Sequence, residues 1–119
     1  SAASDVYKRQ MAASAQSVAD YFGDNILYIN VMNNLSIDCD CDSNPHDPEM
    51  KDIGILASTD PVALDQACLD LVYAVKPTEG NDNRPLVNRI ESLHGRHTVD
   101  YAETIGLGSK NYELVVLDT

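Results

Sequence analysis

One junction constrains the fold of this chain more than any other feature: a short apolar segment leads directly into the start of a helix. Residues 52–57 read Asp-Ile-Gly-Ile-Leu-Ala, which has the length and composition of a buried strand. Asp60 and Pro61 follow two residues later. Aspartate is preferred at the N-cap of a helix, and proline at its first helical position. Residues 61–75 then form a helical pattern that is apolar nearly all round, which predicts burial against a sheet. The junction therefore predicts a layered α/β structure.

The rest of the chain supplies the other predicted elements. The pattern predicts helices over residues 11–22 and 84–93, a further helix capped by Thr98, and strands over residues 25–32 and 112–117. Gly106 is placed to end the helix that Thr98 begins. The order predicts an α/β fold: a small single domain with about three strands in a mixed sheet, packed with four helices.

Composition limits the size of the domain and the class of partner. The chain has 119 residues, of which 44% are hydrophobic, enough for one core. Its formal net charge of -11 argues against nucleic acid and anionic lipid as partners, because both bind through cationic contacts. The chain has no apolar run near the ~20 residues that span a bilayer, and no basic, apolar leader, so we expect a cytoplasmic address and no membrane.

The first ten residues fit poorly with the rest of the chain. The run Ser-Asp-Val-Tyr-Lys-Arg-Gln within residues 1–10 resembles adapter-derived sequence at broken ends of reading frames, so we expect a non-native leader there. Residues 11–119 then form a single α/β domain, expected to be the C-terminal fragment of a larger protein. Surface left uncovered in such a fragment predicts self-association, with a homo-oligomer as one expected partner.

The loop over residues 33–51 carries the most suggestive chemistry. Cys39 and Cys41 alternate with three aspartates in Asp-Cys-Asp-Cys-Asp, and the chain has only one other cysteine. In an extended segment both thiols point to one side, roughly 6.6 Å apart, near the limit for a disulfide and suited to a chelate. Zinc or iron is the expected metal, with His46 or a carboxylate completing the site. The alternative is an acidic loop whose thiols are close together by chance.

Five other residues attract attention, each with an ordinary explanation beside it. Asp60 is either a helix cap or a ligand. Asp65 is expected to be partly buried, and either backbone amides or a cation would satisfy it. Cys68 lies on an apolar face and behaves there as a small hydrophobe. His94 sits where a helix macrodipole attracts cations, and either it or His97 could reach the acidic loop.

Several blocks together resemble a known family. They are Leu-Tyr-Ile-Asn at 27–30, Asp-Cys-Asp-Cys at 38–41, Asp-Ile-Gly-Ile-Leu-Ala-Ser-Thr-Asp-Pro-Val-Ala-Leu-Asp-Gln-Ala at 52–67, Tyr-Ala-Glu at 101–103 and Ile-Gly-Leu-Gly-Ser at 105–109. In this order they resemble the C-terminal part of the uncharacterised iron-sulfur centre proteins grouped as domain of unknown function 362. The resemblance implies a ferredoxin-like segment upstream as a partner, with iron-sulfur clusters in the full-length family but not on this chain.

These observations leave three functions open. The first is a metal-binding or redox-associated domain of an iron-sulfur centre protein, with Cys39, Cys41, His46 and Asp60 as the predicted metal ligands. The second is a non-catalytic structural domain that seats a ferredoxin module. The third is an enzyme that holds an anionic substrate at the helix start near Asp60, although no nucleophile, base and orienting group assemble from the sequence. The reaction, if any, is not indicated.

Overall fold

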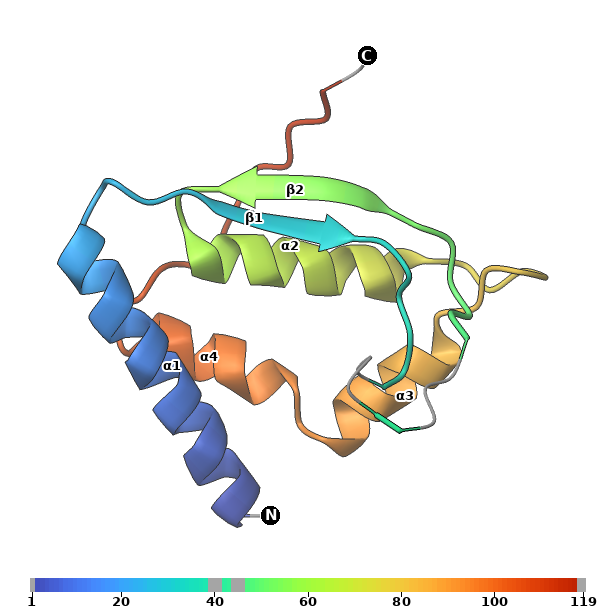
Figure 1. The fold of residues 1–119 in the computed structure, drawn as a ribbon, viewed down its shortest axis with the longest axis horizontal. Helices are drawn as coiled ribbons and strands as arrows, with labels where there is room; N and C mark the ends of the chain where they lie inside the picture. The colour runs from blue at the N-terminus through green and yellow to red at the C-terminus, as the bar shows by residue number, and fades with distance from the viewer. Residues whose placement is uncertain (1, 39–41, 44–46, 118–119) are drawn as a thin grey trace.

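The computed structural model of this chain describes residues 2–38, 42–43 and 47–117. Figure 1 shows a thin sheet lying over one helix, with the other helices below it and to the sides. The elements of the described residues are α1 (Ala2–Phe22), β1 (Tyr28–Met32), β2 (Gly54–Ser58), α2 (Pro61–Ala74), α3 (Arg84–Ser92) and α4 (Arg96–Thr104). The predicted α/β class and the four helices are confirmed.

The sheet differs from the prediction. In the described residues it has two strands and not three, and β1 and β2 pair antiparallel, with Tyr28 opposite Ser58 and Met32 opposite Gly54. The expected mixed three-stranded sheet is therefore wrong. Residues 112–117, expected to be the last strand, lie outside any helix or strand and are exposed at their end, where Leu117 is 86% exposed.

The C-terminal segment lies beside β2 and α2 without pairing in the sheet. A strand needs a neighbouring edge in register, which β-branched composition alone does not supply. The hydroxyl of Tyr112 donates to Asp70 Oδ2 at 2.5 Å, so the segment is tied to α2. A groove of about 790 Å³ is lined by the segment, β2 and α2. The segment runs past the sheet, as Figure 1 shows at the C-terminus.

Helix α2 is the centre of the molecule, as its apolar pattern predicts. It contacts both strands on one side and α4 on another. Its buried residues are Val62, Ala63, Leu64, Ala67 and Val72. Two clusters of buried side chains meet at this helix, one built around Val62 with α1 and α4, and one around Val72 with Met32 and Met50. The core of the domain is thus distributed around α2.

The sheet covers α2 with one face and leaves the other face open. Side chains alternate along a strand, so Ile29, Val31 and Ile55 point away from α2. Their exposed fractions are 58%, 62% and 71%. The open face of an antiparallel sheet is normally polar, and here it is apolar.

Two helix starts differ from the sequence prediction. Helix α1 begins at Ala2, so the described residues of the expected leader, 2–10, form its first half; their origin outside the native protein stays a prediction. Helix α4 begins at Arg96 and not at Thr98, because the N–H of His97 already bonds the carbonyl of His94 at 3.0 Å. Thr98 therefore lies inside the helix and does not cap it. No helix in the described residues is both long enough and apolar enough to cross a membrane.

Candidate metal centre

The connection between α3 and α4 brings two imidazoles together. The N–H of His94 donates to Glu91 O and the N–H of Gly95 donates to Ile90 O, so this connection closes the last turn of α3. Three residues after His94 comes His97, in the first turn of α4. Their ring centroids are 5.1 Å apart, with the ring planes nearly perpendicular.

The backbone of His94 adopts an unusual conformation. Its φ angle is 52°, in the left-handed region that glycine enters freely and other residues seldom enter, with Asn, Asp and His the most frequent among them. Glycine is the preferred residue at this position of a helix C-terminus. A histidine here is a local cost to the fold, and such outliers cluster at functional sites.

A carboxylate from the far end of the chain joins the two rings. Asp5 of α1 lies 92 residues before His97, and its Oδ1 is 3.1 Å from His97 Nδ1. The hydrogen bond with His97 lowers the pKa of the Asp5 carboxyl. One ligand atom from each of Asp5, His94 and His97 lies within 4.8 Å of the other two. Packing of α1 on α4 brings the carboxylate to the imidazoles.

This donor set has the composition of a metal centre. Two imidazoles and one carboxylate match the ligand sets of catalytic zinc and of non-haem iron(II), which keep open coordination positions. Zinc with ligands at 2.0–2.2 Å holds neighbouring donors about 3.3 Å apart. The distance of 3.1 Å from Asp5 Oδ1 to His97 Nδ1 is already of that size. The distances from a ligand nitrogen of His94 to the ligand atoms of the other two residues are at most 4.8 Å. Small side-chain movements would close the set around an ion, because His97 is 50% exposed and Asp5 31%.

A polar pocket of about 360 Å³ adjoins the two imidazoles. Besides His94 and His97 it is lined by Ile90, Glu91, Gly95, Arg96 and Asp100. The guanidinium of Arg96 lies over the ring of Tyr73, with 5.5 Å from its carbon to the ring centroid. Tyr73 in turn donates to Glu91 Oε1 at 2.6 Å, and partial burial together with this hydrogen bond raises the pKa of the phenol. The pocket therefore contains both signs of charge.

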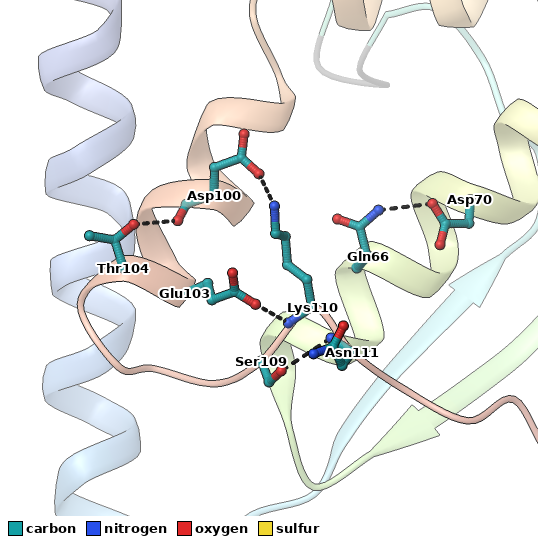
Figure 2. A network of polar contacts seen from close by, with 8 residues as sticks. All are labelled: Gln66, Asp70, Asp100, Glu103, Thr104, Ser109, Lys110 and Asn111. Atoms are coloured by element: carbon teal, nitrogen blue, oxygen red, sulfur yellow. Dashed lines mark hydrogen bonds and ion pairs between the residues drawn. The ribbon is translucent and has the colours of Figure 1, made fainter.

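The second carboxylate of the pocket belongs to a network that Figure 2 shows. Asp100 Oδ1 accepts from Lys110 Nζ at 2.7 Å, and this contact raises the pKa of the Lys110 amine. The backbone N–H of Lys110 donates to Glu103 Oε2 at 2.6 Å, and the carbonyl of Asp100 accepts from the hydroxyl of Thr104 at 3.0 Å. The two bonds from Lys110 hold the segment after α4 against that helix.

Three of the four predicted ligands cannot be placed. Cys39, Cys41 and His46 lie outside the described residues. Before them in the loop, the side chain of Asp38 forms an ion pair with Arg89 of α3, and its carbonyl accepts from Ser36 Oγ at 2.9 Å. The predicted thiol chelate stays a prediction.

The fourth predicted ligand, Asp60, caps α2 as its sequence context indicates. Its Oδ1 accepts from the N–H groups of Val62 at 2.9 Å and Ala63 at 3.1 Å. Its Oδ2 accepts from the N–H of Ser109 at 2.9 Å, which the sequence did not indicate. Gly108 makes this approach possible, because a Cβ there would lie 1.9 Å from Asp60 Oδ1. The carboxylate thus joins the start of α2 to the segment after α4, and a metal role for it stays a prediction.

Asp65 and Cys68 share one partner. Asp65 is exposed, so the prediction of a partly buried carboxylate is wrong; its position on α2 faces outward at the edge of the sheet. Its Oδ1 accepts from Asn30 Nδ2 at 3.0 Å, so a side-chain amide replaces the expected backbone amides. The same amide lies 3.4 Å from Cys68 Sγ. Burial raises the pKa of the Cys68 thiol, which packs beside the core cluster around Val72.

Sequence reasoning singled out two members of the candidate metal centre and missed the third, Asp5. His94 and His97 are singled out by their spacing, but the expected partner was the acidic loop. Asp5 falls in residues 1–10, which the sequence sets apart as a leader. A carboxylate 92 residues away leaves no local signal, because the packing of α1 on α4 creates the contact.

Comparison with known protein families places this chain. The family described as "Domain of unknown function (DUF362)" matches residues 2–70, more than half of the chain. The chain belongs to this family. The matched range includes Asp5 and the junction at Asp60, and ends before His94 and His97. No curated protein and no solved structure matches the chain.

Proposed function

We propose that this DUF362 chain is a metal-binding domain that holds one divalent transition metal ion through Asp5, His94 and His97. The proposal takes residues 2–10 as part of the native chain, against the expected leader, and the family match that begins at residue 2 supports this. The observation that carries the proposal is the convergence of three ligand atoms within 4.8 Å of one another, from α1 and from the α3–α4 connection. The left-handed backbone of His94 adds support, since an imidazole occupies a position where glycine would be easier.

Zinc and iron(II) are the metals that the donor set favours. Imidazole and carboxylate suit both, and two histidines with one carboxylate on one side of the ion leave positions open. Iron in this position would be redox-active, which is how the redox association implied by the iron-sulfur resemblance would apply to this chain. Metal binding also joins α1 to the α3–α4 connection, so the bound ion would stabilise the folded state.

Calorimetric titration of zinc into the chain, with matched variants, tests the proposal. Asp5→Asn and His97→Ala should each weaken zinc binding tenfold or more, because each removes one of three protein ligands. Asp20→Asn is the matched control for the first variant: Asp20 is an exposed aspartate at the other end of the same helix. Equal zinc affinity in Asp5→Asn, Asp20→Asn and the parent chain would overturn the proposed site.

The predicted thiol ligands need a separate test. We propose that Cys39 and Cys41, with His46 or Asp60, form a second site for zinc or iron. Metal binding there should slow alkylation of both thiols, because coordination holds them as ligands. Cys68 serves as the internal control, since its half-buried thiol lies in a core cluster. Unchanged alkylation of Cys39 and Cys41 with metal present would remove this second site and leave the first untouched.

A second candidate function rests on the open face of the sheet. A non-catalytic domain that seats the ferredoxin-like segment implied by the family resemblance needs an apolar docking face, and Ile29, Val31 and Ile55 provide one. Val31→Lys should leave the thermal midpoint of the chain unchanged, since Val31 is 62% exposed, but abolish copurification with a coexpressed ferredoxin-like segment from a family member. Equal copurification by the parent and the variant would contradict docking on this face.

A further inference from the structure

We infer that the open coordination position of the metal takes a small oxyanion, a phosphate or carboxylate group, which Arg96 also holds. This inference rests on the proposed metal site at Asp5, His94 and His97. It adds the class of exogenous ligand and the residue that recognises it.

The position of the pocket is the first argument. Both imidazoles line the polar pocket of about 360 Å³, so a ligand in this pocket lies beside the ion that the imidazoles would hold. Arg96, which separates Gly95 from His97 in the chain, lines the same pocket. A site with three protein ligands leaves a coordination position for water or substrate. The metal and the guanidinium would therefore face one shared space.

The charge balance is the second argument, and it depends on the metal. Around the pocket, the carboxylates of Asp5, Glu91 and Asp100 outnumber the cations of Arg96 and Lys110 by one charge. Metal-bound imidazoles are neutral, so a divalent ion changes this excess of one negative charge into an excess of one positive charge. The empty site should repel an anion, and the loaded site should attract it.

The partners of the charged groups are the third argument. Glu91 already accepts from Tyr73, and Asp100 from Lys110. Arg96 lies over the ring of Tyr73 and also hydrogen-bonds the Tyr73 side chain, and the other N–H donors of its five-donor fork can bind a ligand. A guanidinium edge matches the paired oxygens of a carboxylate or phosphate, which identifies the ligand class as an oxyanion.

The experiment uses the chain with Cys39→Ser and Cys41→Ser, so that the proposed thiol site cannot take the metal, loaded with one equivalent of cobalt(II), whose visible absorption changes when a ligand enters its coordination sphere. Inorganic phosphate and acetate are titrated in separate arms, into this parent chain, Arg96→Gln and Arg84→Gln. Arg84 is the matched control, an arginine at the start of α3 that pairs with Asp82. The metal-free chain is tested for phosphate binding by equilibrium dialysis.

The inference predicts saturable spectral change with at least one oxyanion, weakened tenfold or more in Arg96→Gln and unchanged in Arg84→Gln, with cobalt affinity equal in all three. A response to phosphate alone or to acetate alone identifies the source of the oxyanion. Cobalt binding without any response, equal anion affinity in Arg96→Gln, or equal phosphate binding by the metal-free chain would each overturn the inference and leave the metal site standing. Absence of cobalt binding would overturn the metal site itself, and the inference with it.

Discussion

His94 allows the local backbone strain to be separated from metal binding. Its φ angle of 52° lies in the left-handed region, where an L-residue costs about 1–2 kcal/mol and glycine does not. Replacement by glycine removes this strain but adds about 0.5–1 kcal/mol of backbone entropy in the unfolded chain. Replacement by alanine removes the imidazole and keeps the strain. The free energy of unfolding should therefore be about 1 kcal/mol higher for His94→Gly than for His94→Ala.

Thermal unfolding followed by circular dichroism measures this difference in the metal-free chain. For a domain of this size, about 1 kcal/mol corresponds to about 4 °C in the midpoint. Both variants lose the ring contact with His97 and the metal ligand, so the comparison isolates the backbone. Zinc affinity should fall tenfold or more in both. A His94→Gly midpoint at or below that of His94→Ala would refute the strain argument, and undiminished zinc binding in either variant would refute the ligand role.

Three further predictions concern the segments that hold the fold together. Asp60→Ala should lower the free energy of unfolding in urea by about 2 kcal/mol, because the cap and the bond to Ser109 are both lost; an unchanged urea midpoint would contradict this. Gly108→Ala should displace the carboxylate of Asp60. The variant that carries both Gly108→Ala and Asp60→Ala should therefore be no less stable than Asp60→Ala alone, and additive losses of stability would contradict this coupling. The hydrogen bond to Asp70 raises the pKa of Tyr112 from 10.0 to about 12. Between these two values the folded chain keeps a phenol proton that the unfolded chain releases, so the free energy of unfolding should fall as pH rises from 10 through 12. Asp70→Asn should lower the pKa of the Tyr112 phenol in an absorbance titration.

The elements that the sequence predicts well are those with local signals. Asp60 and Pro61 mark the start of α2 because a cap and a first-turn proline act within one helical turn. The burial of Val62, Leu64 and Val72 follows from the pattern of α2, since a helix that is apolar nearly all round leaves only a narrow polar arc for water. These features depend on neighbours in the chain, so the residue pattern is enough to predict them.

The features that the sequence missed depend on distant contacts. Residues 112–117 have the composition of a strand, but they belong to no strand, and Tyr112 hydrogen-bonds Asp70 of α2. The need for glycine at Gly108 arises from Asp60, far earlier in the chain. In the same way Asp5 becomes a candidate ligand only when α1 packs on α4. Long-range packing leaves no period or spacing to read.

X-ray absorption at the zinc edge tests the proposed metal centre most directly, on the chain with Cys39→Ser and Cys41→Ser, which lacks the proposed thiol site, loaded with one equivalent of zinc. Asp5, His94 and His97 predict a first shell of nitrogen and oxygen at about 2.0–2.2 Å, with the outer-shell scattering of two imidazole rings. A first shell without the outer-shell scattering of imidazole would contradict this centre.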